Sequence, residues 1–148
     1  MKRFFLILLC LIFPLTAFTG CEKSKITDAS QNARTVLING IEADTVEAAM
    51  GAFQGKQGDY IEFKFNKPQT VDTFFIIEKS TSVRQFNIYI ETDGKYKLVY
   101  TGKNILNEEI KIQPEAGTAV KVEIVNTDIQ NNEFQIQSIS IYNSREVK

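Results

Sequence analysis

The sequence predicts an all-β domain in which two antiparallel sheets face each other. Apolar and polar residues alternate in short runs along most of the chain after residue 59, which is the period of a strand with one face in water. Turn-forming residues separate these runs, and only residues 44–50 have apolar side chains at the spacing of a short helix. Many short strands without intervening helices favour a sandwich or a barrel.

The alternating runs predict about eight strands. The clearest run is 60–66, in which Ile61, Phe63 and Phe65 share one face. Proline-containing segments at 66–68 and 114–117 are predicted to be turns that end strands. In chain order, the predicted strands are 35–39, 60–66, 71–78, 85–92, 96–101, 109–113, 120–126 and 134–142.

Two local features are more specific than the strand pattern. Asp93 and Gly94 lie between two runs, and a type I′ turn needs positive φ at both of its central residues, which Asp tolerates and Gly accepts freely. A two-residue hairpin is therefore predicted there. In the last run the apolar phase slips at Gln137 and Ser138, which predicts a β-bulge. The bulge would put four residues on the core side: Phe134, Ile136, Ile139 and Ile141.

Two facing sheets bury the apolar side of each strand. Burial of one large apolar side chain stabilises a domain by roughly 1.5 to 3 kcal/mol, so a few such positions supply most of the required stability. These residues are assigned to the core and to no ligand. The predicted core is Phe63, Phe65, Phe75, Ile77, Phe86, Ile88, Ile90, Val122, Ile124, Ile139 and Ile141.

The N-terminus has the layout of an export signal. Lys2 and Arg3 are followed by an apolar run at 4–13, and then by smaller and more polar residues up to Cys21. The apolar run is short for a membrane span, and polar residues follow Cys21 at once, so cleavage is predicted. The mature chain then begins at Cys21, and residues 1–20 are the signal peptide.

This segment resembles a bacterial lipoprotein signal, in which small residues precede a cysteine that is lipidated and becomes the new N-terminus. Thr19 and Gly20 fit that pattern. The resemblance implies a lipid anchor on Cys21, a membrane-bound protein of the bacterial cell envelope, and location at the outer membrane. The alternative is an ordinary secretory signal that leaves Cys21 as a free thiol. Residues 21–33 are polar and are interpreted as a tether.

Composition excludes several classes of protein. The second cysteine, Cys10, lies inside the signal, so the exported chain has no disulfide framework and depends on its core. After residue 20, 15 basic residues face 18 acidic ones, a net charge of −3, and no basic patch suits nucleic acid. The length supports one domain, assigned to 34–143, with a tail at 144–148.

The order of five segments resembles the discoidin-like (coagulation factor C-type) branch of the galactose-binding jelly rolls. The similarity covers about residues 35–143 and is greatest to the modules at the C-terminal side of alpha-L-fucosidases and to carbohydrate-binding modules of family 32. It implies an eight-stranded jelly-roll sandwich whose loops at one end bind the terminal sugar of a glycan. The five segments are 58–65, 71–78, 84–94, 119–124 and 136–142.

Members of this family often stack Trp on the sugar and use His, Arg or Asn for its hydroxyls. This chain contains no Trp and no His. Stacking is therefore expected from Phe53 or Phe134. Planar amides and charged groups that suit pairs of hydroxyls are expected to donate and accept the hydrogen bonds. These candidates are Gln54, Lys79, Arg84, Asn131 and Asn132.

The resemblance also implies a structural calcium near the first loop and a pair of charged loop residues. Asp44 and Thr45 match the calcium ligands only loosely, and Ser138 stands near the position of a usual acidic residue. Calcium takes six to eight oxygens, so no metal and no cofactor is expected. Glu78 and Arg84 match a Glu and an Arg of the fucosidase-type module. They are interpreted as an ion pair that braces a loop, in preference to ligand contacts.

Two other functions compete with sugar binding. Glu42, Asp44 and Glu47 lie close in sequence, and a glycosidase needs two carboxylates. A chain without His and without a usable thiol has few general bases or nucleophiles, so no enzymatic activity is expected.

The remaining alternative is an assembly or adhesion subunit that binds an envelope protein. Its candidate contact residues are aromatic side chains on strands, because aromatic residues are favoured at protein interfaces. They are Phe74, Tyr89, Tyr96 and Tyr100. The preferred interpretation is a lipid-anchored, non-catalytic module that holds glycans at the cell envelope.

Overall fold

The computed structural model describes residues 28–44, 53–128, 130 and 132–144. The predictions for the signal peptide, for Cys21, for Glu47 and Asn131, and for most of the helix at 44–50 lie outside the described residues. Among the described residues, no helix has the length and apolar character required to cross a membrane.

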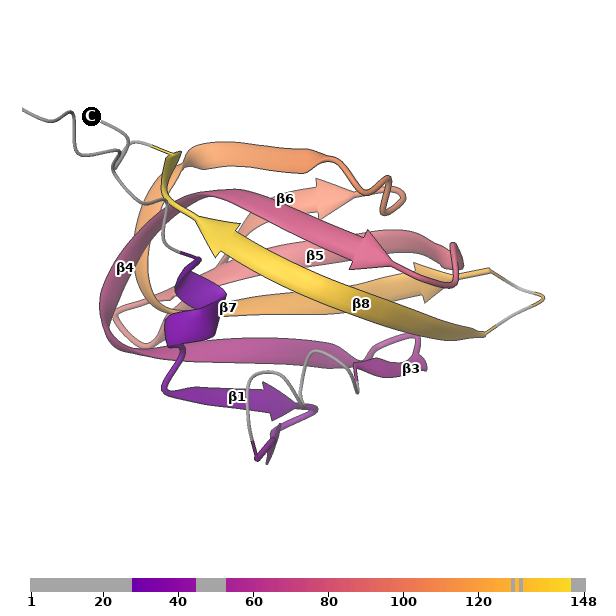
Figure 1. Cartoon of the computed structure of the whole chain (residues 1–148), viewed down its shortest axis with the longest axis horizontal. Helices are drawn as coiled ribbons and strands as arrows, with labels where there is room; N and C mark the ends of the chain where they lie inside the picture. The colour runs from indigo at the N-terminus through magenta and orange to yellow at the C-terminus, as the bar shows by residue number, and fades with distance from the viewer. Residues whose placement is uncertain (1–27, 45–52, 129, 131, 145–148) are drawn as a thin grey trace, which may run out of the picture.

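Within these residues the chain forms a short 3-10 helix and eight strands (Figure 1). All strand pairs are antiparallel. The elements are η1 Ala29–Asn32, β1 Thr35–Ile38, β2 Ile41–Glu42, β3 Gln54–Lys56, β4 Tyr60–Glu78, β5 Val83–Thr92, β6 Lys95–Gly102, β7 Glu109–Thr127 and β8 Glu133–Tyr142.

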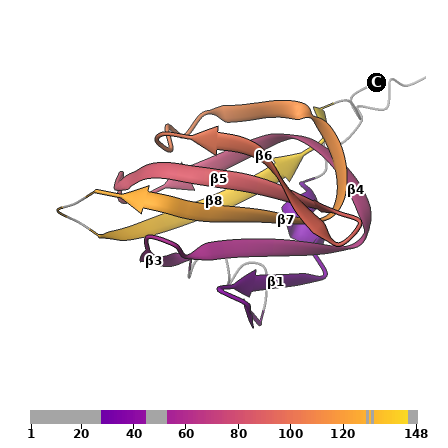
Figure 2. The same cartoon turned by 180° about the vertical axis from the view of Figure 1, so that it is seen from behind.

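Two long strands, β4 and β7, run through both layers of the sandwich. The N-terminal half of β4 pairs with β1 and with the C-terminal half of β7, which in turn pairs with β5. With β2 and β6 at the edges, these strands form the first layer. The C-terminal half of β4 lies between the N-terminal half of β7 and β8, and β8 also pairs with β3. These strands form the second layer. Figure 1 shows β8 in front, and Figure 2 shows β5 and β6 from the opposite side.

The predicted turns at 66–68 and 114–117 do not end strands, because each lies inside a continuous long strand. The pairing of β4 with β7 is shifted between Lys64 and Gln69. Pro68 lies in this irregular stretch, where its missing N–H breaks no regular ladder bond. Irregular pairing of this kind bends a strand, and β4 curves from one layer to the other here. The predicted boundaries of β1, β5, β6 and β8 agree with the structure to within two residues, whereas the predicted breaks inside β4 and β7 were wrong.

Both specific local predictions are confirmed. Asp93 and Gly94 have φ values of 52° and 72°, as a type I′ hairpin requires. The pairing of β8 with β4 shifts by one residue at Gln137, which is the extra residue of the bulge. The four apolar residues on either side of it are all buried: Phe134, Ile136, Ile139 and Ile141.

The core lies between the two layers, and one strand of the prediction was out of phase. Phe74 and Ile76 are buried at 0% and 1% exposure, whereas Phe75 and Ile77 are only half-buried and lie on the outer face. All four residues are apolar, so either phase satisfied the sequence pattern. The phase is decided by the register shift between Lys64 and Gln69, where four residues of β4 face one residue of β7, and this odd difference exchanges the inward and outward positions of β4. The other predicted core residues are buried.

The domain begins earlier than predicted. Residues 28–33 were assigned to the tether, but η1 packs against β8, and Ala29 and Ser30 are buried. Asp28 explains this placement. Its Oδ1 accepts hydrogen bonds from the backbone N–H of Ser30 at 3.0 Å and from the N–H of Ile141 at 2.9 Å. These hydrogen bonds hold the start of the domain against its last strand, β8.

Candidate functional site

A cleft of about 360 Å³ lies at the end of the sandwich where β8 begins, opposite the end where β8 finishes at Tyr142; Figure 1 shows the course of β8. It is called the loop-end cleft below. Short strand β3, the start of β8 and the loop between β4 and β5 form its walls. Its lining residues are Gln54, Gly55, Lys56, Ser80, Glu133, Phe134 and Gln135.

The pairing of β3 with β8 positions one wall of the cleft. Gln54 lies opposite Gln135, and Lys56 lies opposite Glu133. Gly55 stands between them because a Cβ there would lie 2.1 Å from Oδ2 of Asp59. That carboxylate oxygen accepts a hydrogen bond from the backbone N–H of Lys56 at 2.8 Å. The absence of a side chain at Gly55 thus leaves room for the Asp59 carboxylate to pack against β3.

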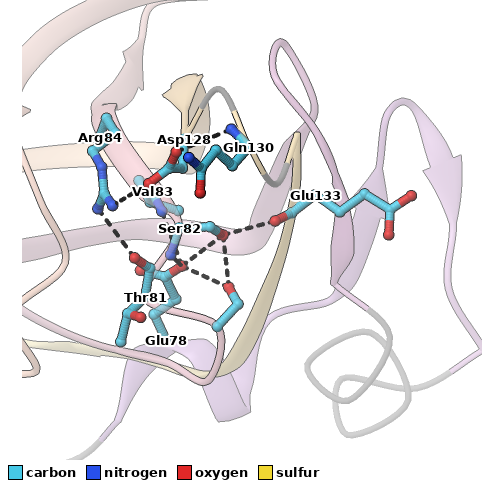
Figure 3. A network of polar contacts seen from close by, with 9 residues as sticks. Glu78, Thr81, Ser82, Val83, Arg84, Asp128, Gln130 and Glu133 are labelled. Carbon is cyan, nitrogen blue, oxygen red and sulfur yellow. Dashed lines mark hydrogen bonds and ion pairs between the residues drawn. The ribbon is translucent and has the colours of Figure 1, made fainter.

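A buried carboxylate holds the opposite wall (Figure 3). Glu78 is 5% exposed, and its Oε1 accepts hydrogen bonds from the hydroxyl of Ser80 at 2.7 Å and from the backbone N–H groups of Ser82 and Val83 at 2.6 and 3.0 Å. The Ser82 hydroxyl also donates to the carbonyl of Glu133 at 2.7 Å. These contacts attach the β4–β5 loop to β8 and so hold this wall of the cleft in place.

The predicted ion pair between Glu78 and Arg84 is wrong. Arg84 is exposed, and it pairs instead with Asp128 at 2.6 Å and donates to the carbonyl of Thr81 at 3.0 Å (Figure 3). Glu78 faces the interior of the loop, and Arg84 faces solvent. Both residues brace the β4–β5 loop, but they do so through separate sets of contacts.

The two phenylalanines expected to stack on a sugar are core residues. Phe53 is 0% exposed and Phe134 is 2% exposed, and their rings meet edge to face with centroids 5.0 Å apart. Phe134 lies in the inward phase of β8, and the carbonyl of Phe53 accepts a hydrogen bond from the N–H of Ile136 at 2.9 Å. The expectation that either ring offers an open face to a sugar is therefore wrong.

The polar candidates that the structure describes lie at the same end of the molecule, but only one of them lines the cleft. Gln54 is exposed on the cleft wall. Lys79 is exposed on the adjoining loop, where its N–H donates to the carbonyl of Gln135 at 2.8 Å. Asn132 accepts a hydrogen bond from the hydroxyl of Thr127 at 3.1 Å. The described polar candidates therefore lie at the end of the sandwich that carries the loop-end cleft.

Sequence reasoning missed four polar residues of the cleft. A signal was available for two of them, because Glu133 and Gln135 occupy the outward phase of β8 beside the buried Phe134. The other two depend on the pairing of β3 with β8 and on the loop brace, which no local pattern encodes. The four residues are Lys56, Ser80, Glu133 and Gln135.

The described residues do not fit the calcium site that the resemblance implied. Calcium takes six to eight oxygen ligands, several of them carboxylates. No group of three or more acidic, His or Cys side chains could hold a metal ion in the described part of the chain. Asp44 is described, and Thr45 lies outside the described residues.

Three tyrosines surround one lysine on the outer face of the first layer. The Nζ of Lys121 lies 5.4 Å from the ring centroid of Tyr60 and 4.6 Å from those of Tyr89 and Tyr96. These four residues define the tyrosine–lysine face. Of the other two aromatic candidates for a protein contact, Phe74 is buried, and Tyr100 is half-buried with its ring 5.8 Å from that of Phe86.

Two hydroxyls of this face have carboxylate partners within the molecule. The Tyr89 hydroxyl donates to Glu123 at 2.8 Å, and the Tyr96 hydroxyl donates to Glu62. Burial raises the pKa of the Tyr96 phenol, and the hydrogen bond to Glu62 raises it further. Burial and the hydrogen bond to Glu123 likewise raise the pKa of Tyr89. The hydroxyls of Tyr89 and Tyr96 are therefore satisfied by carboxylates of the same chain.

Comparisons with known proteins independently support the assignment of the fold. No family model matches the sequence, and no curated protein is significantly similar to it. Solved structures do match. Chitosan-binding module 1 of a chitosanase/glucanase from Paenibacillus sp. IK-5 superposes with a TM-score of 0.63 at 15% identity, and the match covers 80% of this chain and 99% of that one.

Two further matches have the same architecture. The family 32 carbohydrate-binding module of AlyQ, solved in complex with 4,5-unsaturated mannuronic acid, has a TM-score of 0.60 at 15% identity over 76% of this chain and 96% of that one. A protein from Bacteroides thetaiotaomicron assigned as an alpha-L-fucosidase has a TM-score of 0.53 at 22% identity over 64% of this chain and 22% of that one. The chain therefore has the galactose-binding-like sandwich fold of family 32 modules, as the resemblance of its five segments implied.

Proposed function

We propose that this chain is a non-catalytic carbohydrate-binding module and that the loop-end cleft is its sugar site. The observation that supports this proposal is the lining of the cleft. Its volume of about 360 Å³ falls within the range of small-molecule sites, and it brings amides, a hydroxyl, an ammonium and a carboxylate to one surface. Sugars present closely spaced hydroxyls, which these groups can pair with as donors and acceptors.

The compared structures support the class of ligand. One of them is named as a chitosan-binding module, and another was solved with an unsaturated mannuronic acid. Both share the sandwich fold with this chain at 15% identity. The fold therefore accommodates sites for different sugars, and the choice of sugar depends on the loop residues.

Binding in this cleft relies on hydrogen bonds held by a rigid frame. Both phenylalanine rings are buried, so Gln54 and Gln135, which face each other across β3 and β8, are the natural hydroxyl partners. The Glu78 network fixes Ser80 before any ligand arrives, which lowers the entropy lost on binding. A shallow polar site without stacking gives weak affinity for one sugar.

The cleft does not support glycoside hydrolysis. Such enzymes use two carboxyl groups that flank the bond to be cleaved. Glu133 is the only carboxylate among the described residues that line the cleft. The buried Glu78 has its Oε1 occupied by the loop, so the proposed role is binding without catalysis.

A glycan array probed with the soluble domain from Asp28 tests the proposal. The domain is expected to bind at least one family of terminal sugars. Gln54→Ala and Gln135→Ala should each weaken that binding by about fivefold to tenfold, because each removes one hydrogen-bonding partner. Gln31→Ala, which removes an exposed amide from η1, is the matched control. Silence of the unmodified domain across terminal galactose, fucose, amino sugars and uronic acids would refute the proposal.

We further propose that Cys21 carries a lipid that holds the module at the bacterial cell envelope, so that it retains glycans there. The support is the export-signal pattern that ends at Cys21. Metabolic labelling with a fatty-acid analogue should mark the full chain and leave Cys21→Ser unlabelled. Equal labelling of both chains, or of neither, would show that Cys21 is not the anchor.

A further inference from the structure

The outer face of the second layer carries a groove close to the C-terminal end of β8. A hollow of about 620 Å³ is lined by Thr73, Phe75, Glu109, Lys111, Tyr142 and Ser144. A second hollow of about 220 Å³ shares three of these residues and extends along 112–114 of β7. Together the two hollows are called the sheet groove. It is separate from the loop-end cleft and shares no lining residue with it.

An irregular strand pairing creates the groove. In the pairing of β4 with β7, Val71 lies opposite Glu115, but Thr73 lies opposite Lys111. Three residues of β7 therefore face a single residue of β4, and β7 bends away from its neighbour at this point. The flat face of the sheet is hollowed here as a result.

The floor of the groove is aromatic. Thr73 pairs with Tyr142, and Phe75 pairs with Ser140, so Phe75 and Tyr142 are diagonal neighbours on the outer face. Diagonal neighbours of this kind lie about 7 to 8 Å apart at their backbones, within reach of aromatic side chains. Both residues are half-buried, and both line the hollow. The outer face of the second layer thus offers the aromatic surface that the loop-end cleft lacks.

The rim of the groove is polar and carries charges of both signs. Lys111 pairs with Glu109 at 3.4 Å, and both side chains are exposed. The Ser144 hydroxyl donates to Oδ2 of Asp72 at 2.6 Å, and the Thr73 hydroxyl donates to Oδ1 of the same residue at 2.8 Å. The described lining of the two hollows thus sets Lys111 against two carboxylates, Glu109 and Asp72, so it gives no advantage to an acidic membrane or an acidic ligand. The hydroxyls of an uncharged ligand can pair with these groups as donors and acceptors.

We propose that the sheet groove is a second saccharide site, which takes an uncharged oligosaccharide. One sugar ring lies over Phe75 and Tyr142, and the chain continues into the smaller hollow beside Pro114. The hydroxyls of the ligand meet the Lys111–Glu109 pair and Ser144 at the rim. The elongated, two-part shape of the groove favours an oligosaccharide over a single sugar.

This inference rests on the proposed carbohydrate-binding function and extends it to two sites in one module. Tyr142 in the groove lies seven steps along β8 from Gln135 in the cleft, which corresponds to about 23 Å along the strand. A polysaccharide that reaches both sites would be held by two weak contacts at once, and the second contact benefits from a high effective concentration.

Nitrogen–proton NMR titrations of the soluble domain test the proposal. The probes are uncharged hexasaccharides of β-1,4-linked glucose, galactose or mannose at millimolar concentration. At least one probe is expected to shift the amide signals of Ser140, Tyr142 and Lys111. Shifts at Gln54, Lys56 and Gln135 report the loop-end cleft separately, so failure of one site is distinguishable from failure of the other.

Two conservative variants identify the contact. Phe75→Leu and Tyr142→Leu keep apolar volume but remove the flat ring, and each should weaken binding at the groove by about threefold to tenfold. Their melting temperatures should stay close to that of the unmodified domain, and the signals of the loop-end cleft should respond as before. Absence of groove shifts with all three probes, or unchanged affinity in both variants, would overturn the proposal.

Discussion

The two outer faces of the sandwich both carry aromatic side chains, but they differ in what those side chains contact. On the first layer, Tyr89 and Tyr96 flank Lys121 and donate to carboxylates of their own chain. On the second layer, Phe75 and Tyr142 line an open groove. The first face is stabilised by contacts within the molecule, and the second leaves its rings available to a ligand.

This difference shows why counting aromatic residues on strands does not locate a binding surface. The tyrosine–lysine face matched the expectation for an adhesion subunit, because its rings gather on one outer face. Two of its three hydroxyls and its cation nevertheless have partners within the molecule. A protein partner would have to replace those contacts, which reduces the net gain from binding. We therefore favour the second layer and the loop-end cleft as ligand surfaces.

The largest expected effect is a difference in the free energy of unfolding between variants at an inner and at an outer aromatic residue of the second layer. Phe74→Ala should lower the free energy of unfolding by about 3 to 5 kcal/mol, because its fully buried ring would leave a cavity. Phe75→Ala removes a half-buried ring and should cost less than about half as much. Urea denaturation measures both losses. Equal losses would show that Phe75 is structural and that the groove is part of the core.

A smaller difference in the free energy of unfolding is expected between variants of the lysines on the two outer faces. Lys121→Gln should lower the free energy of unfolding by about 1 kcal/mol, because the ammonium contacts three rings. Lys111→Gln removes one member of an exposed pair and should change it by less than about 0.5 kcal/mol. Urea midpoints compared at constant salt measure both changes. A larger loss at Lys111 would reverse the comparison of the two faces.

The smallest expected effect is on the pH dependence of the stability of the domain. The pKa values of Tyr89 and Tyr96 are raised in the folded domain, so these phenols stay protonated while those of the unfolded chain ionise near their usual value of 10.0. Their contribution to stability is complete below that pH and is lost as the pH rises above it. The double change of Tyr89→Phe and Tyr96→Phe should therefore flatten the fall in the urea midpoint between pH 9 and pH 11, approximately. A slope identical to that of the unmodified domain would contradict this assignment.

Much of the fold was predictable because it follows from local chemistry. The hairpin at Asp93 and Gly94 needs only two residues that tolerate positive φ, and the bulge at Gln137 follows from a slip in apolar phase. The continuity of β4 was not predictable, because a proline such as Pro68 normally ends a central strand. Only the pairing with β7 shows that the irregular stretch accommodates it.

The candidate site was predictable to one end of the molecule but not to its residues. Phe53 and Phe134 lie at the correct end, yet their rings pack against each other in the core. The run 74–77 is apolar at every position, so its inward phase depends on a register shift that no sequence pattern shows. The sheet groove was missed for the same reason, since it depends on Phe75 facing outward.

The continuity of β4 and β7 has a consequence for how the domain loses its structure. Two strands of 19 residues each contribute hydrogen bonds to both layers, so neither layer can detach while the other stays intact. Amide protons in the regularly paired stretches of β4 and β7 on either side of the bend should exchange with deuterium only when the whole domain unfolds. A sugar bound at either end would therefore slow this exchange throughout the molecule.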